Sequence, residues 1–110
     1  MSEHTKDYID KVISIGDYSH VLFFEVLGIP GRIANSPIEA YGIIQEELSE
    51  KGHKLILISK KYSDEFPEDI SDINLSGDKI VFELPENGED EKTGIADKIM
   101  SILGVSNNEY

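Results

Sequence analysis

Three short apolar segments constrain most strongly what this chain can fold into. They cover residues 21–27 (VLFFEVL), 53–62 (HKLILISKKY) and 78–84 (DKIVFEL). Each is rich in residues that favour strands, and glycine, proline or charged residues interrupt the chain between them. The sequence therefore predicts a sheet whose strands are largely buried.

Two helices are expected between and after these segments. Ser36-Pro37-Ile38-Glu39 has serine at the N-cap, proline at the first helical position and glutamate three residues after the cap, which is a capping box. It predicts a helix that runs to about Lys51 and stops at Gly52. A last helix is expected over residues 90–103, with Gly104 as its stop.

Residues 9–16 fit both a helix and a strand. Residues 11–16 (KVISIG) are similar to 54–59 (KLILIS), and 21–26 are similar to 79–84, so an internal ββα repeat favours the strand. The predicted fold is then a two-layer α+β sandwich of order ββαββα. It is a permuted ferredoxin-like arrangement with both helices on one face of an antiparallel sheet. The alternative keeps residues 4–15 helical and gives αβαββα.

The length of 110 residues suits one domain covering residues 1–110. Residues 1–8 are expected to form a loose arm, 63–77 a long acidic loop and 105–110 a frayed tail. The chain contains no cysteine, which excludes disulfides and thiolate chemistry. Neither a signal peptide nor a membrane span is visible, so we expect a cytoplasmic protein without a membrane partner.

Charge limits the partners. Twenty-two acidic residues against ten basic ones give a formal net charge of −12. A phosphate backbone would be repelled, so no nucleic-acid partner is expected. A protein partner with a basic surface would be attracted.

The loop between residues 28 and 36 is the predicted ligand site, because it leads into the capped helix. Backbone donors at a helix N-terminus attract anions, and Arg32 could clamp one. The order apolar segment, Gly-x-Pro-Gly-x-Ile-Ala, helix, Gly, apolar segment over residues 21–59 resembles the opening of ACT domains. Those regulatory modules bind amino acids near this loop, although here the helix begins later than in that family and no fourth strand follows the last helix. The ligand residues predicted for an anionic metabolite or amino acid are Gly28, Gly31, Arg32, Asn35 and Ser36.

Metal and cofactor sites are not expected. Residues 72–83 match some ligand positions of an EF-hand loop, but a proline precedes them and a strand follows, so an ordinary turn is the better interpretation. The three histidines lack the spacing of a metal site. Glu25 and Glu83 each interrupt an apolar segment, and two neighbouring carboxylates could support acid–base chemistry. No catalytic residue is assigned.

The expected interface is the face of the first long apolar strand that carries Val21, Phe23, Glu25 and Leu27. With both helices on the other side of the sheet, this face would need a cover. The favoured function is a non-enzymatic interaction or regulatory domain that self-associates here. A small-ligand sensor is the alternative, and a small enzyme using Glu25 or Glu83 is the third.

Overall fold

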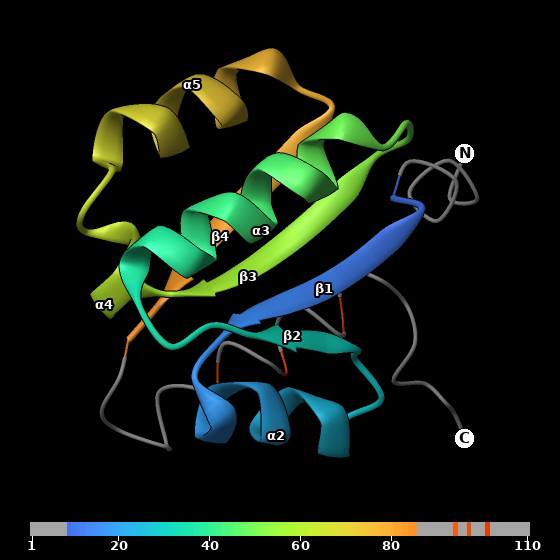
Figure 1. Ribbon diagram of the computed structural model, residues 1–110. Helices are drawn as coiled ribbons and strands as arrows, with labels where there is room; N and C mark the ends of the chain where they lie inside the picture. The colour runs from blue at the N-terminus through green and yellow to red at the C-terminus, as the bar shows by residue number, and fades with distance from the viewer. Residues whose placement is uncertain (1–8, 86–93, 95–96, 98–100, 102–110) are drawn as a thin grey trace.

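The computed structural model describes residues 9–85, together with Gly94, Asp97 and Ser101. Over this part of the chain the sheet has four strands in the order β2-β1-β3-β4, and every pair of neighbours is parallel. The strands are β1 (Lys11–Gly16), β2 (Gly31–Ile33), β3 (Lys54–Ser59) and β4 (Lys79–Leu84). The helices are α2 (Tyr18–Val26), α3 (Pro37–Ser49), α4 (Lys60–Ser63) and α5 (Pro67–Ser76) (Figure 1).

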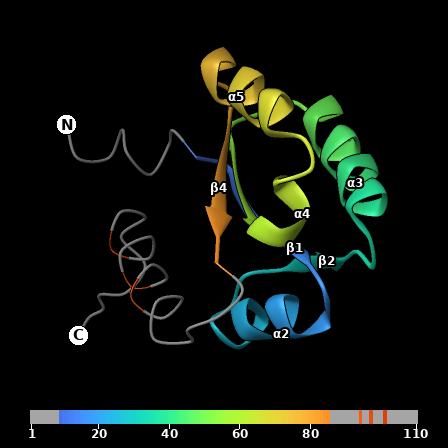
Figure 2. The same cartoon turned by 90° about the vertical axis from the view of Figure 1, so that its left-hand side faces the viewer.

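Helices lie against the sheet as connections between its parallel strands. Figures 1 and 2 show α3, α4 and α5 together on one face, whereas α2 lies apart from them beside β1 and β2. Two apolar clusters follow from this division. The cluster with α3–α5 contains Ile44, Ile56 and Ile58, and the cluster with α2 contains Phe24 and Leu57. Alternate residues of β3 therefore enter opposite clusters, so this strand is buried on both faces.

The mixed α and β fold class, with helices packed on a four-stranded sheet, is confirmed. Strands over residues 11–16, 54–59 and 79–84 are present as expected, and so is the helix after Ser36. The antiparallel ββαββα topology is wrong, because every strand pairing is parallel. Strands buried on both faces give nearly continuous apolar sequences, and such strands are characteristic of parallel sheets joined by helical crossovers.

Residues 21–27 do not form a strand, since residues 18–26 form α2. The Asp17 side chain begins this helix by accepting a hydrogen bond from the His20 backbone N at 3.0 Å. Gly28, with φ of 90°, stands in the left-handed conformation just after its end. The strand that follows β1 in the chain is instead β2, which forms one edge of the sheet, so the ββα repeat and the start of the ACT-like order are wrong as well.

The long acidic loop predicted over residues 63–77 is also wrong, because α5 and part of α4 occupy it. Pro67 begins α5, two acidic residues follow in its first turn, and Gly77 with φ of 87° ends it. The αβαββα alternative fails because residues 11–16 are a strand.

Some predictions lie outside the described residues. These are the arm over 1–8, the tail over 105–110 and most of the helix over 90–103, in which Gly94, Asp97 and Ser101 are helical. Among the helices that the structure describes, none has the length and apolar character needed to cross a membrane.

Candidate functional site

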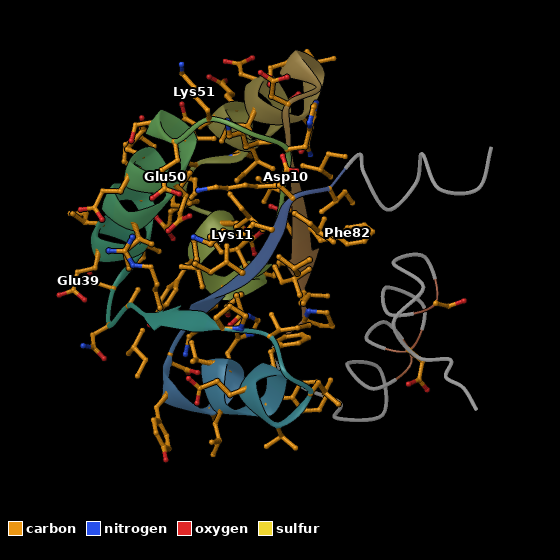
Figure 3. All side chains as sticks on the ribbon, turned by 90° about the vertical axis from the view of Figure 1, so that its right-hand side faces the viewer. Asp10, Lys11, Glu39, Glu50, Lys51 and Phe82 are labelled. Carbon is orange, nitrogen blue, oxygen red and sulfur yellow. The ribbon has the colours of Figure 1, made fainter. Side chains whose placement is uncertain are left out.

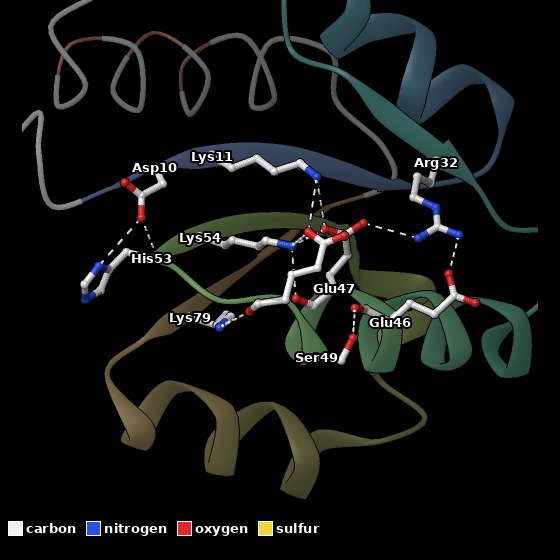
Figure 4. Close-up of polar contacts among 10 residues, drawn as sticks. Asp10, Lys11, Arg32, Glu46, Glu47, Ser49, His53, Lys54 and Lys79 are labelled. Atoms are coloured by element: carbon white, nitrogen blue, oxygen red, sulfur yellow. Dashed lines mark hydrogen bonds and ion pairs between the residues drawn. The ribbon is translucent and has the colours of Figure 1, made fainter.

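A row of three lysines crosses the sheet at the starts of its strands. Lys11, Lys54 and Lys79 are direct neighbours in the strand register. All three reach the C-terminal end of α3, where Lys11 and Lys54 pair with Glu50 and the Lys79 Nζ donates to the Glu50 carbonyl at 2.7 Å (Figure 4). Cations at the C-terminus of a helix stabilise its dipole and its free carbonyls.

Glu47 lies at the centre of this network. Its side chain is only 4% exposed, and its Oε1 lies 2.6 Å from the Lys54 Nζ, itself on a side chain that is 3% exposed. The second oxygen, Oε2, accepts a hydrogen bond from Arg32 on β2 at 3.2 Å. Arg32 also contacts Glu46, one residue earlier on α3, at 2.6 Å. The Lys11 Nζ of β1 lies 3.4 Å from Oε1, so this one buried carboxylate connects α3 to three strands.

The pKa values record how tightly the network is paired. Burial alone would raise the pKa of Glu47, but hydrogen bonds from Lys54 and Arg32 outweigh it and lower that pKa. Burial likewise opposes the charge on Lys54, yet its two glutamate partners raise its pKa. Glu47 and Lys54 therefore hold each other in the charged form, and their pair acts as a structural tie.

A second ion pair lies at the opposite ends of the strands, where β1 and β3 finish. The Lys61 Nζ lies 2.7 Å from Asp17 Oδ2, and this bond lowers the pKa of Asp17 to about 2. In open parallel sheets ligands bind outside the carboxyl ends of the strands, at the point where the strand order reverses. Here that point lies between β1 and β3, and a side-chain pair already occupies it.

The outward surface of α2 is apolar. Tyr18, Leu22 and Val26 follow one another at helical spacing, and each is exposed, Val26 by 79%. Ile33 on β2 is exposed as well and projects from the same side of the sheet as α2. That side follows from Gly31, two residues earlier, where an added Cβ would lie 2.7 Å from Val21 of α2. The outer residues of α2 and Ile33 of β2 are thus exposed apolar side chains on the same side of the sheet.

The residues predicted to bind an anion are engaged with the chain itself. Arg32 is paired with Glu46 and Glu47. Ser36 caps α3 by accepting from the Glu39 N at 3.1 Å, and the Asn35 N donates to the Glu39 side chain at 2.7 Å. The capping box is thus confirmed, while ligand binding by Gly28, Gly31, Arg32, Asn35 and Ser36 stays a prediction.

The predicted interface residues lie on α2 and just after it. Val21 faces the interior, Phe23 is half-buried, and Glu25 and Leu27 are exposed. A common strand face for these four residues does not exist, because successive helical residues point in different directions.

On β4, Val81 belongs to the cluster with α3–α5 and Ile80 to the cluster with α2. Because side chains alternate along a strand, Glu83 shares the side of Val81, whereas Phe82, labelled in Figure 3, points to the other side, on which α2 with Glu25 lies. The structure does not bring the two carboxylates together.

No group of three or more metal-binding side chains occurs within the described part of the chain. The residues compared with an EF-hand lie partly on α5, and the later ones lie on β4. This helical geometry differs from that of a calcium loop.

Comparison with protein families identifies the chain. The model of the ATP synthase (F/14-kDa) subunit family matches residues 12–102, which is most of the sequence. The chain belongs to this family. The searches of curated proteins and of solved structures gave no match.

Membership of the F/14-kDa family corrects the predicted function. The favoured role is corrected to that of a subunit of a complex, and the small-ligand sensor and the small enzyme are wrong, because the family consists of subunits of ATP synthase. Association with other subunits of a complex follows from this. The family match does not test the predicted self-association, which stays a prediction. Tyr18, Leu22, Val26 and Ile33 were not among the interface residues predicted from the sequence. With Asp17 as an N-cap, the spacing of four residues from Tyr18 to Leu22 and Val26 indicates one face of a helix.

Proposed function

We propose that this protein is a non-catalytic subunit of an ATP synthase that docks on a neighbouring subunit through the outer face of α2 and the adjacent edge strand β2. Tyr18, Leu22, Val26 and Ile33 form this surface, which we call the α2 face. The observation that carries the proposal is this exposed apolar row in a chain of the F/14-kDa family.

Two physical features support the α2 face. Exposed apolar rows on helices are typical of surfaces that become covered in an assembly. The edge strand β2 is only three residues long and has one parallel neighbour, β1, within the described sheet. The outer edge of β2 therefore presents backbone N–H and C=O groups that a partner could hydrogen-bond.

The partner is expected to offer a basic surface. The whole chain carries a net charge of −12, and four of its ten cations lie in the network between α3 and the sheet. Opposite charge on the partner would speed its encounter with the acidic surface and fix its orientation.

The test is incorporation into the ATP synthase. The complex is purified without this subunit and mixed with wild type, Val26→Lys or Leu22→Lys, and the bound fraction is measured by native mass spectrometry. We expect both variants to incorporate at least about tenfold less tightly than wild type. Leu75→Lys is the matched control, because Leu75 on α5 is 81% exposed but lies off the α2 face. Equal incorporation of all variants would refute the α2 face, and no binding by wild type would refute the proposed function.

A further inference from the structure

An apolar groove lies on the other side of the sheet, between the start of α3 and the junction of α4 with α5. It has a volume of about 480 Å³ and is lined by Ser36, Pro37, Ile38, Tyr41, Glu65 and Phe66. The Tyr41 and Phe66 rings meet edge to face, with centroids 5.2 Å apart. The groove therefore has a firm aromatic wall.

Ile38 forms the exposed side of this groove. Ile38 is 84% exposed and is the second residue of α3, whose N-terminus is capped. Neither the capping box nor the contacts of α3 with the sheet need an apolar side chain here. What distinguishes Ile38 from a singly exposed aliphatic residue such as Leu75 is that it lines the groove together with Tyr41 and Phe66.

One carboxylate lines the groove, and two more follow closely in the chain. Glu65 is part of the wall, and Glu68 and Asp69 follow in the first turn of α5. Within residues 9–85, none of these three carboxylates forms an ion pair, whereas the nearby Lys60 and Lys61 are paired with Asp64 and Asp17. An incoming group with positive charge would meet unneutralised carboxylates.

From this combination we infer that the groove binds a segment of a neighbouring ATP synthase subunit in which an apolar side chain is flanked by lysine or arginine. The apolar side chain would enter between Ile38, Tyr41 and Phe66, and the flanking cations would meet Glu65, Glu68 and Asp69. This inference rests on the proposed function, but it uses the face of the sheet opposite to the α2 face. The protein would then contact its complex on both sides.

The apolar part is tested with Ile38→Gln in the binding assay on the ATP synthase that lacks this subunit. We expect the dissociation constant to rise at least about tenfold. Leu75→Gln is the matched control, because both residues are exposed aliphatic side chains on helices of the same face. Circular dichroism melting checks that both variants are folded.

The charged part is tested with the double variant Glu65→Gln, Glu68→Gln. We expect slower association and a weaker dependence of the association rate on salt. The double variant Asp72→Asn, Glu83→Gln removes the same charge elsewhere and should associate like wild type.

The outcomes separate the two proposals. If Ile38→Gln binds as well as Leu75→Gln while Val26→Lys fails to bind, the groove inference is overturned and the α2 face stands. The inference is also overturned if both double variants slow association equally, since net charge alone would then explain the effect. Failure of wild type to bind would overturn both.

Discussion

Replacing the buried carboxylate of Glu47 is the sharpest test of the network between α3 and the sheet. Glu47→Gln leaves the ammonium of Lys54, 3% exposed, without its 2.6 Å partner and also removes the charge facing Arg32. Removing one partner of a buried ion pair costs about 3–5 kcal/mol. Glutamine keeps one oxygen and Glu50 still pairs with Lys54, so we expect a loss of about 2–3 kcal/mol in the free energy of unfolding.

The assay is urea unfolding at pH 7, followed by circular dichroism, with Glu46→Gln as control. Glu46 is next to Glu47 on α3 and pairs with Arg32, but it is 66% exposed, so its loss should cost no more than about 0.5 kcal/mol. Equal effects of the two substitutions would refute the claim that burial makes the Glu47 contacts strong.

The pH dependence of the free energy of unfolding gives a second test of Glu47, in which wild type is compared with Glu47→Gln. The pKa of Glu47 is lower in the folded protein than its ordinary value of 4.5. The ionised carboxylate therefore stabilises the fold above about pH 4.5, and this contribution is lost as the pH falls through the folded pKa. The difference between wild type and Glu47→Gln should shrink from pH 7 to pH 3, and a constant difference would contradict the assignment.

Three further predictions concern other parts of the fold. Asp17→Asn keeps the N-cap of α2 but loses the pair with Lys61, so its stability deficit against wild type in thermal melts should shrink as the pH falls from 3.8 to about 2. A deficit that grows with acid would contradict this sign. Gly31→Ala should destabilise by about 1–3 kcal/mol, because its Cβ would lie 2.7 Å from Val21 and closer still to Ser14. Gly42→Ala, with open space around it on α3, should stabilise by about 0.5–1 kcal/mol in the same urea assay.

Local sequence signals predicted the helix whose first turn contains capping residues. The helix after Ser36 was found because its cap, proline and glutamate act within four residues. The same signals stand at Pro67 and Gly77, but the few apolar side chains of α5, such as Ile70 and Ile73, lie among acidic ones, a pattern that favours a loop. Helix ends were informative even where the apolar pattern was weak.

Residues 21–27 could not be assigned from hydrophobicity alone. A short run that is apolar on all sides fits a buried strand and a helix equally, and α2 is apolar on its outer face as well as its inner one. That outer face is the very surface proposed for docking. The apolar groove could not be predicted either, since it joins residues 36–41 to 65–66, whose proximity depends on the crossover after β3.

The order of strands in the sheet affects how the chain can fold while it is being synthesised. β1 is synthesised before the other three strands but lies in the interior of the sheet, and its Val12 pairs with Leu55, which follows 43 residues later. At a ribosomal rate of about 5–20 residues per second, the nascent chain waits roughly 2–9 seconds for this neighbour. During that time the apolar side chains of β1 cannot be covered by β3, and α2 can shield only part of one face. Translation speed over residues 12–55 should therefore influence how much of the protein reaches its native state in the cell.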